Sequence, residues 1–295
     1  MNNGGSEGKH SVNPIQWFPG HMAKTRRLIS ENLKQVDIVF ELLDARAVSS
    51  SRNPEIKKLT AGKPVLTLLN KSDLADAAIN KKWLEYFKSA GENVLLADCK
   101  NFTGNNNIYT ETKKILNEKL ERYKNKGMAG RRLRAMILGI PNVGKSSLLN
   151  KLCGAAKAKI ENRPGVTLRK QWVSADTGLE LLDTPGVLWH KFESEEVGLN
   201  LTFIGSIKDD ILDGPENAVK LCGVLYRKYP AELCARYKLK NLPENISGYE
   251  IFEKIARGRG FMASGGEIDD ERCAKTILTE FRAAKIGRIS LEEPE

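Results

Sequence analysis

A phosphate-binding pattern lies near the middle of the chain, at residues 139–146. Gly139, Gly144, Lys145 and Ser146 occupy the required positions of G-x-x-x-x-G-K-[ST]. Glycines in such a loop let backbone N–H groups close around phosphate oxygens. We expect Lys145 to reach the β- and γ-phosphates and the Ser146 hydroxyl to bind Mg²⁺. The expected nucleotide contacts here are Asn142, Val143, Gly144, Lys145, Ser146 and Ser147.

The flanks of this pattern have the required character. Residues 133–138 are apolar apart from Arg134 and short enough for a buried strand, and residues 147–152 are typical of the first turns of a helix. The alternative is a chance match or a plain strand-to-helix turn. Because strand, glycine-rich loop and helix follow in order, the sequence predicts a nucleotide-binding site.

A second pattern, N-K-x-D at Asn70, Lys71 and Asp73, predicts which base is bound. Guanine offers N1–H and N2–H₂ side by side, and the Asp73 carboxylate can accept both. Adenine lacks these donors, and a site built for hydrogen bonds rejects such a ligand by on the order of 10⁴-fold. Asn70 is expected to support the loop and the base, and the Lys71 stem to cover the base plane. GTP and GDP are therefore the predicted ligands.

A third pattern, D-x-x-G at residues 183–186, is typical of the loop that senses the γ-phosphate. We expect Asp183 to hold Mg²⁺ through water and the Gly186 N–H to bond the γ-phosphate. Thr167 is the candidate for a mobile threonine that closes on Mg²⁺ and the γ-phosphate; the alternative is a threonine in a turn. Loss of these contacts on hydrolysis would release the loops, as in a switch.

The elements that must position these motifs alternate between strands and helices. Buried strands are predicted at residues 36–43, 65–69, 94–96 and 133–138, and a hairpin at 171–174 and 179–182. Helices are predicted at residues 22–34, 54–60, 79–89 and 105–126. This order indicates an α/β fold with a mostly parallel sheet. Ligands of such sheets bind at the carboxyl ends of the strands, where these motifs lie.

The domain organisation follows from changes in composition along the chain. Residues 1–13 are polar and are expected to be a disordered tail, followed by a GTPase domain at 14–204. From about Phe203 helical periodicity dominates, so we expect a small helical domain at 205–295. Asp269 is the predicted N-cap of its last helix. The base-reading motif precedes the phosphate loop, which implies a circularly permuted P-loop GTPase domain.

Several short motifs together resemble a known family. They are Trp17 to Met22, Asp44 to Arg46, Ser51 to Pro54, Asn70 to Asp73, Gly139 to Ser147, Pro164 to Thr167, Asp183 to Gly186, Gly265 to Asp269 and Gly287 to Ile289. In this order they resemble the ribosome biogenesis GTPase A family. The resemblance implies GTP hydrolysis coupled to late maturation of the large ribosomal subunit, with ribosomal RNA contacted by the C-terminal domain. Val48 and residues 97–100 depart from the family pattern.

The catalytic group is the least defined part of the expected site. Val187 stands where many GTPases carry a glutamine that orients water, so intrinsic hydrolysis should be slow. The resemblance implies that His21, with Lys145, takes the catalytic role, because a neutral imidazole can orient or deprotonate water. The alternative for His21 is a helix cap or an RNA contact. Asn142 is a candidate ligand for K⁺, or a loop asparagine that bonds its own backbone.

Composition favours a polyanionic partner. The chain of 295 residues has 47 Lys and Arg against 37 Asp and Glu, a formal net charge of +10. The region expected to contact RNA phosphates contains Lys113, Lys114, Lys119, Arg122, Lys124, Lys126, Arg131, Arg132 and Arg134. No apolar run approaches a membrane span, and five cysteines without C-x-x-C fit reduced thiols, so we expect a cytoplasmic monomer. The alternatives are a GTP-sensing RNA-binding module with negligible turnover and a GTPase of a non-ribosomal process.

Overall fold

The computed structural model of the protein describes residues 19–295, apart from a set of internal positions. These are 101–104, 129, 154–171, 176–177, 183, 185, 187, 189–191, 193 and 208–213, together with the side chains of residues 19–25 and 105–106. The predicted disordered tail lies outside the described residues.

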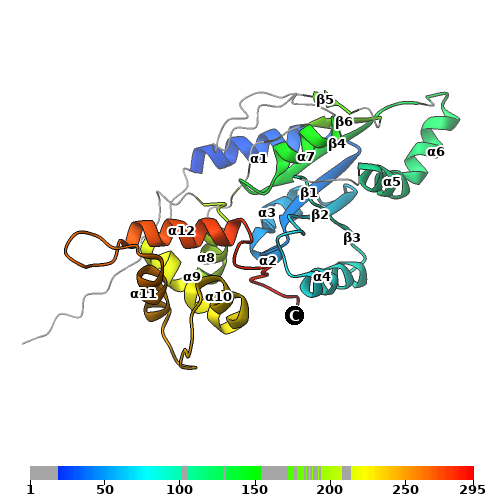
Figure 1. The fold of residues 1–295 in the computed structure, drawn as a ribbon. Coiled ribbons are helices and arrows are strands. Elements are labelled where there is room, and N and C mark those ends of the chain that lie inside the picture. Colours follow the sequence, from blue (N-terminus) through cyan, green and yellow to red (C-terminus); the bar gives the residue numbers. More distant parts are fainter. Residues whose placement is uncertain are drawn as a thin grey trace, which may run out of the picture.

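A six-stranded sheet forms the centre of the described structure (Figure 1). Its strands are β1 (Ile38–Asp44), β2 (Val65–Asn70), β3 (Asn93–Leu96), β4 (Leu133–Gly139), β5 (Trp172–Ser174) and β6 (Leu179–Leu182). Their order is β3-β2-β1-β4-β6-β5, and every pair is parallel except β5 with β6. This confirms the predicted mostly parallel sheet and the predicted hairpin.

The register of the central strands places three loops at one edge of the sheet. Asp44 at the end of β1 lies opposite Asn70 at the end of β2, and Leu42 of β1 lies opposite Gly139 at the end of β4. All residues of β1 are buried, as expected for a strand covered on both faces. The base-reading motif and the phosphate loop therefore begin side by side.

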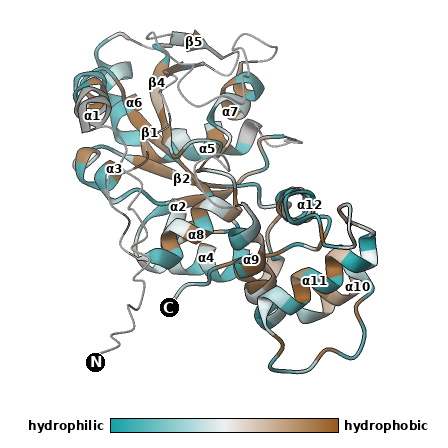
Figure 2. Ribbon diagram, turned by 90° about the vertical axis from the view of Figure 1, so that its left-hand side faces the viewer, coloured by the Kyte–Doolittle hydropathy of each residue, from teal (hydrophilic) through white to brown (hydrophobic). Residues whose placement is uncertain are grey.

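Helices cover both faces of the sheet (Figure 2). On one face, α1 (Pro19–Leu33), α3 (Pro54–Leu59) and α4 (Ala77–Ser89) contribute the buried side chains Ile29, Leu33, Ile56, Trp83 and Phe87. On the other, α5 (Asn105–Ile115) and α7 (Lys145–Leu152) contribute Ile108, Leu148 and Leu149. This two-faced cover explains why the predicted strands read as continuous apolar runs.

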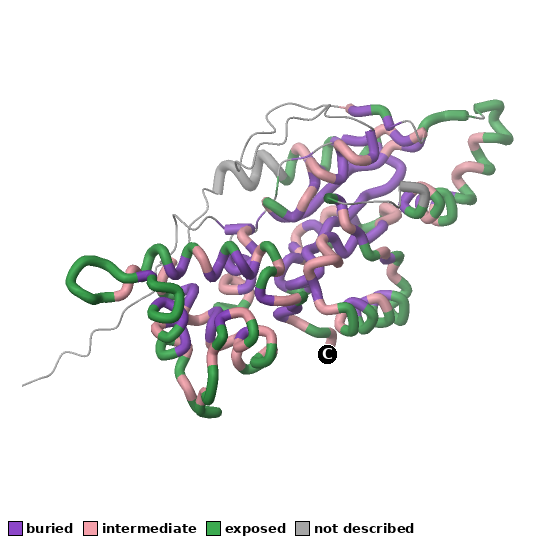
Figure 3. Tube along the Cα trace, viewed as in Figure 1, coloured by how far each residue is buried: buried purple, intermediate pink, exposed green. Residues whose placement is uncertain are grey.

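The prediction of a single helix at residues 105–126 was wrong in one respect. It is two helices, α5 and α6 (Asn117–Asn125), separated at Leu116, whose ψ is 14°. Leu116 is buried in the main core, whereas none of the residues of α6 is buried. The break thus lets Leu116 pack inward while α6 turns toward solvent (Figure 3).

The chain after the sheet is helical, as predicted. Its helices are α8 (Glu195–Phe203), α9 (Gly214–Lys228), α10 (Pro230–Tyr237), α11 (Gly248–Arg259) and α12 (Asp270–Arg282). Asp269 accepts the Arg272 N–H at 3.0 Å and caps α12, which confirms the predicted cap. After α12 the chain returns to the sheet and ends beside α4 (Figure 1). In the described part of the chain, no helix combines the length and apolar character needed to cross a membrane.

Candidate nucleotide-binding site

The phosphate loop joins β4 to α7 in a conformation that requires glycine. Gly144 is the N-cap of α7, with φ of 109°, and a Cβ at this position would overlap the Asn70 amide. The buried Lys145 ammonium donates to the Ile140 carbonyl at 2.8 Å and the Gly139 carbonyl at 3.2 Å. The first N–H groups of α7 have no acceptor within the helix, so this end of α7 is suited to an anion.

Asn70 connects three loops at the carboxyl edge of the sheet. Its Nδ2 donates to the Val143 carbonyl of the phosphate loop at 2.6 Å, and its Oδ1 accepts the Cys99 N–H at 2.9 Å. Asn70 is itself buried, so both contacts are shielded from water. The base-reading motif is thereby held against the phosphate loop, as a nucleotide that spans both would need.

The loop after β3 supports the base-reading motif although its sequence departs from the family pattern. The Ala97 carbonyl accepts the Ser72 N–H at 3.1 Å and the Ser72 hydroxyl at 2.9 Å. Burial of the Cys99 thiol, with the nearby Asp98 charge, raises its pKa to about 12. The backbone of this loop, rather than its side chains, makes the supporting contacts with Ser72.

Lys71, whose side chain is 23% exposed, contacts a buried pair of charges. Its ammonium is 2.9 Å from Asp44 Oδ2 and donates to the Asn142 carbonyl at 2.9 Å. Asp44, whose side chain is 1% exposed, also accepts two bonds from the Arg46 guanidinium, at 2.9 and 2.8 Å. Burial would raise the pKa of Asp44, but Arg46 and Lys71 outweigh it and hold the pKa well below its usual range. The carboxylate therefore stays charged.

This cluster was missed by reasoning from the residues. The sequence marks Asp44 and Arg46 only as part of a family motif, and nothing local pairs them with Lys71. The cluster also reaches the end of the chain. The Arg46 guanidinium donates to the Arg282 carbonyl at 3.2 Å, and the main-chain carbonyl of Arg46 accepts the Leu291 N–H at 2.7 Å. The same residues thus join the base-reading motif to the helical region.

Asp73 is partly buried at the end of the same motif. Burial raises the pKa of its carboxyl, and the charge of Asp98 raises it further. The ionised carboxylate is the form that can accept two hydrogen bonds at once. Acidification should therefore remove this acceptor at higher pH than for an ordinary aspartate.

The third motif approaches the phosphate loop through Gly186. A Cβ on Gly186 would lie 2.9 Å from the Pro141 N and 3.1 Å from the Lys145 ammonium. The backbone of Gly186 thus lies against the phosphate loop, which brings together Gly186, Asn142, Lys145 and the base-reading motif. Asp183, Thr167 and Val187 lie outside the described residues. His21 lies in the first turn of α1, and its side chain is outside them too.

The side chain of Asn142 links the phosphate loop to the helical region. Asn142 has φ of 58°, and its Nδ2 donates to the Gly205 carbonyl at 2.8 Å. Neither of the two roles predicted for Asn142, K⁺ ligation or a bond to its own loop, includes this contact. It places the phosphate loop beside the start of the helical region.

Comparison with known proteins identifies the family. A family model described as 50S ribosome-binding GTPase matches residues 134–213. A ribosome biogenesis GTPase A from Bacillus licheniformis is 46% identical over 281 residues, which cover 95% of this chain and 99% of the relative. The chain belongs to the ribosome biogenesis GTPase A family. The Thermotoga maritima member is 34% identical over 95% of each chain.

Solved structures of this family share the fold of the GTPase described here. A GDP-bound YlqF matches with a TM-score of 0.67 and 30% identity, covering 91% of this chain and 99% of that one. A GNP-bound YlqF from T. maritima matches with a TM-score of 0.64 over 92% of this chain and 99% of that one. The predicted family and the circularly permuted α/β fold followed by helices are confirmed.

Proposed function

We propose that this GTPase is a GTP/GDP switch in late assembly of the large ribosomal subunit. Its relatives carry the name ribosome biogenesis GTPase A, and the matching family model is described as ribosome-binding. The observation that carries a nucleotide-dependent mechanism is the hydrogen bond from Asn70 Nδ2 to the Val143 carbonyl, which fixes the base-reading motif to the phosphate loop. A nucleotide that spans both segments can then contact the base-reading motif with its base and the phosphate loop with its phosphates.

The proposed nucleotide contacts are divided between these two segments. Asp73 reads N1–H and N2–H₂ of guanine, Asn70 supports the motif, and the Lys71 stem covers the base. Residues 142–147 hold the phosphates, with Lys145 on the β- and γ-phosphates and the Gly186 N–H on the γ-phosphate. The close approach of Gly186 to Lys145 supports this arrangement, because both groups must meet the same phosphate.

Mg²⁺ is the proposed metal, with Ser146, Thr167 and Asp183 as its protein-side ligands. Hydroxyl and carboxylate oxygens are the donors that Mg²⁺ prefers, and it commonly takes one or two from the protein beside substrate phosphates and water. When bound, it would neutralise charge that develops on the phosphates. K⁺ is a second proposed ion, with Oδ1 of Asn142 as the ligand, since Nδ2 is engaged with Gly205.

His21 is the proposed water-orienting group, together with Lys145 on the phosphates. A neutral imidazole can accept a proton from water near pH 7 and orient the oxygen for attack. The position of His21 in the first turn of α1 is compatible with a side chain that is positioned by a helix. Hydrolysis by the free protein is expected to be slow, because Val187 cannot orient water.

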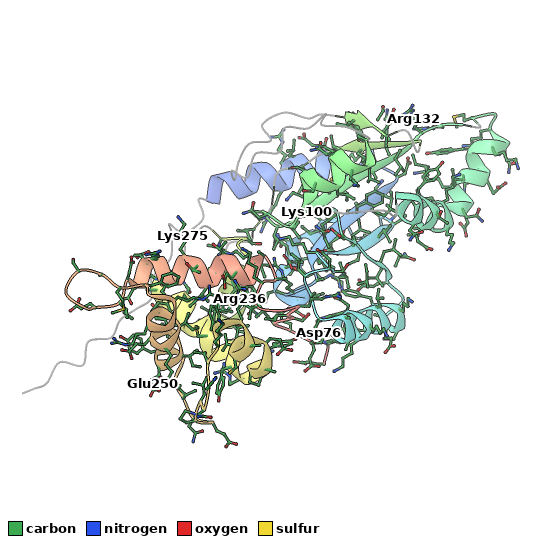
Figure 4. All side chains as sticks on the ribbon, in the orientation of Figure 1. Asp76, Lys100, Arg132, Arg236, Glu250 and Lys275 are labelled. Atoms are coloured by element: carbon green, nitrogen blue, oxygen red, sulfur yellow. The ribbon has the colours of Figure 1, made fainter. Side chains whose placement is uncertain are left out.

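The proposed RNA contacts come from exposed basic side chains in two regions. Four of the nine basic residues predicted near α5 and α6 form ion pairs within the described chain, namely Lys114, Lys119, Arg122 and Arg134. The other five are exposed and remain candidates, together with two exposed lysines of the helical region: Lys113, Lys124, Lys126, Arg131, Arg132, Lys254 and Lys275. Lys275 projects from α12, and Arg132 lies at the far end of the molecule (Figure 4). Phosphate contacts of this type would make binding strongly salt-dependent.

We divide the chain into a GTPase domain at 14–204 and a helical RNA-binding domain at 205–295. Gly205 has φ of 79° directly after α8, which is compatible with a boundary at that point. We also propose that the protein acts as a monomer in the cytoplasm, where its proposed partner, a precursor of the large subunit, is assembled.

The test is GTP hydrolysis by the purified protein, with and without large-subunit precursors, in K⁺ and Na⁺ buffers. We expect slow basal turnover, acceleration by the precursors, and loss of that acceleration in His21→Ala without weaker GTP binding. Failure of precursors to accelerate turnover would overturn the ribosomal switch. If the precursors still accelerate turnover by His21→Ala, His21 has no catalytic role, but the proposed ribosomal switch is not contradicted.

A further inference from the structure

The last residues of the chain form a strap across the base-reading motif. We define the C-terminal strap as residues 286–293, which follow α12 and return to the sheet beside α4 (Figure 1). Three of its residues are each at least 98% buried, namely Ile289, Ser290 and Leu291. This part of the strap is therefore packed into the protein and does not lie on its surface. Its contacts include residues of the base-reading motif and of the segment after it, more than 200 positions earlier in the chain.

The strap is hydrogen-bonded to the segment that directly follows the base-reading motif. The Ile289 N–H donates to the Leu74 carbonyl at 3.2 Å, and the Asp76 N–H donates to the Ser290 hydroxyl at 3.2 Å. Asp76, labelled in Figure 4, is the N-cap of α4 on this side of the molecule. The strap therefore follows the chain from the motif into α4.

Arg288 is the strap residue whose side chain reaches the motif itself. Its Nε donates to the Ala75 carbonyl at 3.0 Å, and its Nη2 donates to the Ser72 carbonyl at 3.0 Å. These two carbonyls stand on either side of Asp73 and Leu74. The forked guanidinium can hold both at once, which a single ammonium cannot do with the same geometry. It also places a positive charge near Asp73.

We infer that Arg288 is a positioning residue for guanine recognition, which holds the Ser72 and Ala75 carbonyls so that the Asp73 carboxylate is presented to the base. Arg288 acts through the loop and is not assigned a contact with the nucleotide. The inference rests on the proposed role of Asp73. Because coupling between two sites is reciprocal, a bound guanine nucleotide should in turn stabilise the strap.

The consequence is a change in base selectivity, which general destabilisation would not produce. Hypoxanthine keeps the N1–H of guanine and lacks the 2-amino group, so IDP offers Asp73 one hydrogen bond instead of two. A loosely held Asp73 gains less from the second bond. Loss of Arg288 should therefore weaken GDP binding more than IDP binding and reduce the preference for GDP, by about fivefold or more if the coupling is of ordinary size.

The experiment compares GDP and IDP affinities of the full chain by fluorescence titration or calorimetry. The variants are Arg288→Ala, Arg288→Lys and the control Lys82→Ala, which removes the ion pair of Lys82 with Glu293 at the outer end of the strap. We expect a reduced GDP/IDP ratio in Arg288→Ala, an intermediate ratio in Arg288→Lys and an unchanged ratio in Lys82→Ala. An unchanged GDP/IDP ratio in folded Arg288→Ala would overturn the inference, whatever its GDP affinity.

Arg288 is exposed, so its truncation opens no cavity. A second measurement uses the wild-type chain and needs no variant. In the wild-type chain, backbone amides of residues 286–293 should exchange with deuterium more slowly with GDP than with IDP at saturation. Equal exchange would also overturn the inference. Asp73→Asn distinguishes failure of the proposed base-reading role from failure of the role of Arg288. If Asp73→Asn keeps the preference for GDP over IDP, Asp73 does not read the base. If Asp73→Asn loses that preference while Arg288→Ala keeps it, only the role of Arg288 is removed.

Discussion

Asp44→Asn should be one of the most damaging conservative changes in the chain. The side chain of Asp44 is 1% exposed and that of Arg46 is 2% exposed, and Lys71 lies 2.9 Å from the same carboxylate. The amide keeps the shape of the carboxylate but removes its charge and turns an N–H₂ group toward a cation. Removing one partner of a buried ion pair costs about 3–5 kcal/mol, because the remaining charge is left uncompensated. That is a large part of a total stability of about 5–15 kcal/mol.

The assay is urea unfolding followed by circular dichroism at pH 7. We expect a lower midpoint with an unchanged slope for Asp44→Asn. The matched control is Glu118→Gln, the same carboxyl-to-amide change in the exposed pair of Glu118 with Arg122, where less than about 1 kcal/mol is expected. A loss below about 1 kcal/mol in Asp44→Asn would refute the view that this cluster is a charged centre of the fold.

The pH dependence provides a second arm of the same experiment. The pKa of Asp44 is lowered in the folded protein, so its contribution to stability is complete above the pKa of the unfolded chain, about 3.9, and is lost as pH falls toward the folded value. The difference between wild type and Asp44→Asn should be constant above about pH 5 and shrink below about pH 4. If the stability difference between the two proteins stays constant down to the pH of acid unfolding, the lowered pKa of Asp44 is contradicted.

Three further predictions concern single residues elsewhere in the chain. Gly144→Ala should weaken GDP binding by about 10- to 100-fold in a titration, because its Cβ would overlap the Asn70 amide in a left-handed backbone conformation. Glu41 is buried with an unpartnered Oε1, and burial raises its pKa, so its contribution to stability is complete below about pH 4 and is lost as pH rises through the folded value. Glu41→Gln should therefore gain stability relative to wild type as pH rises, measured by thermal unfolding at several pH values. Cys234 is the half-buried thiol among five free cysteines, so one fast-reacting thiol per chain is expected with a thiol reagent, and Cys234→Ser should abolish it.

Much of the fold could be predicted because its signals are local. Buried strands of a parallel sheet read as short apolar runs, and the polar motifs follow them directly at residues 70–73 and 139–146. Strand ends meet at one edge of such a sheet, so adjacency of the base-reading motif and the phosphate loop follows from the strand order alone. The order itself, with β1 between β2 and β4, required the structure.

The parts that could not be predicted depend on distant partners or on packing. Nothing near Lys71 in the sequence marks Asp44 as its partner, and Arg288 contacts Ser72 across 216 positions. The break at Leu116 has no glycine or proline as a signal, and it follows from the need of one leucine to reach the core while α6 stays exposed. Such features are decided by tertiary structure, not by local propensity.

The arrangement of these contacts gives the permuted chain order a physical consequence. Two contacts with the nucleotide site lie at opposite ends of the helical region: Asn142 of the phosphate loop donates to the Gly205 carbonyl, and Arg288 donates to the Ser72 carbonyl of the base-reading motif. One contact lies at the start of the helical region and the other near the end of the chain. A nucleotide that draws the phosphate loop and the base-reading motif together would therefore act on both ends of the helical region at once. Loss of the Asn142 contact should weaken the coupling of that region to the phosphate loop. Loss of Arg288 should weaken its coupling to the base-reading motif, where the contacts of Arg46 and Leu74 with the end of the chain remain.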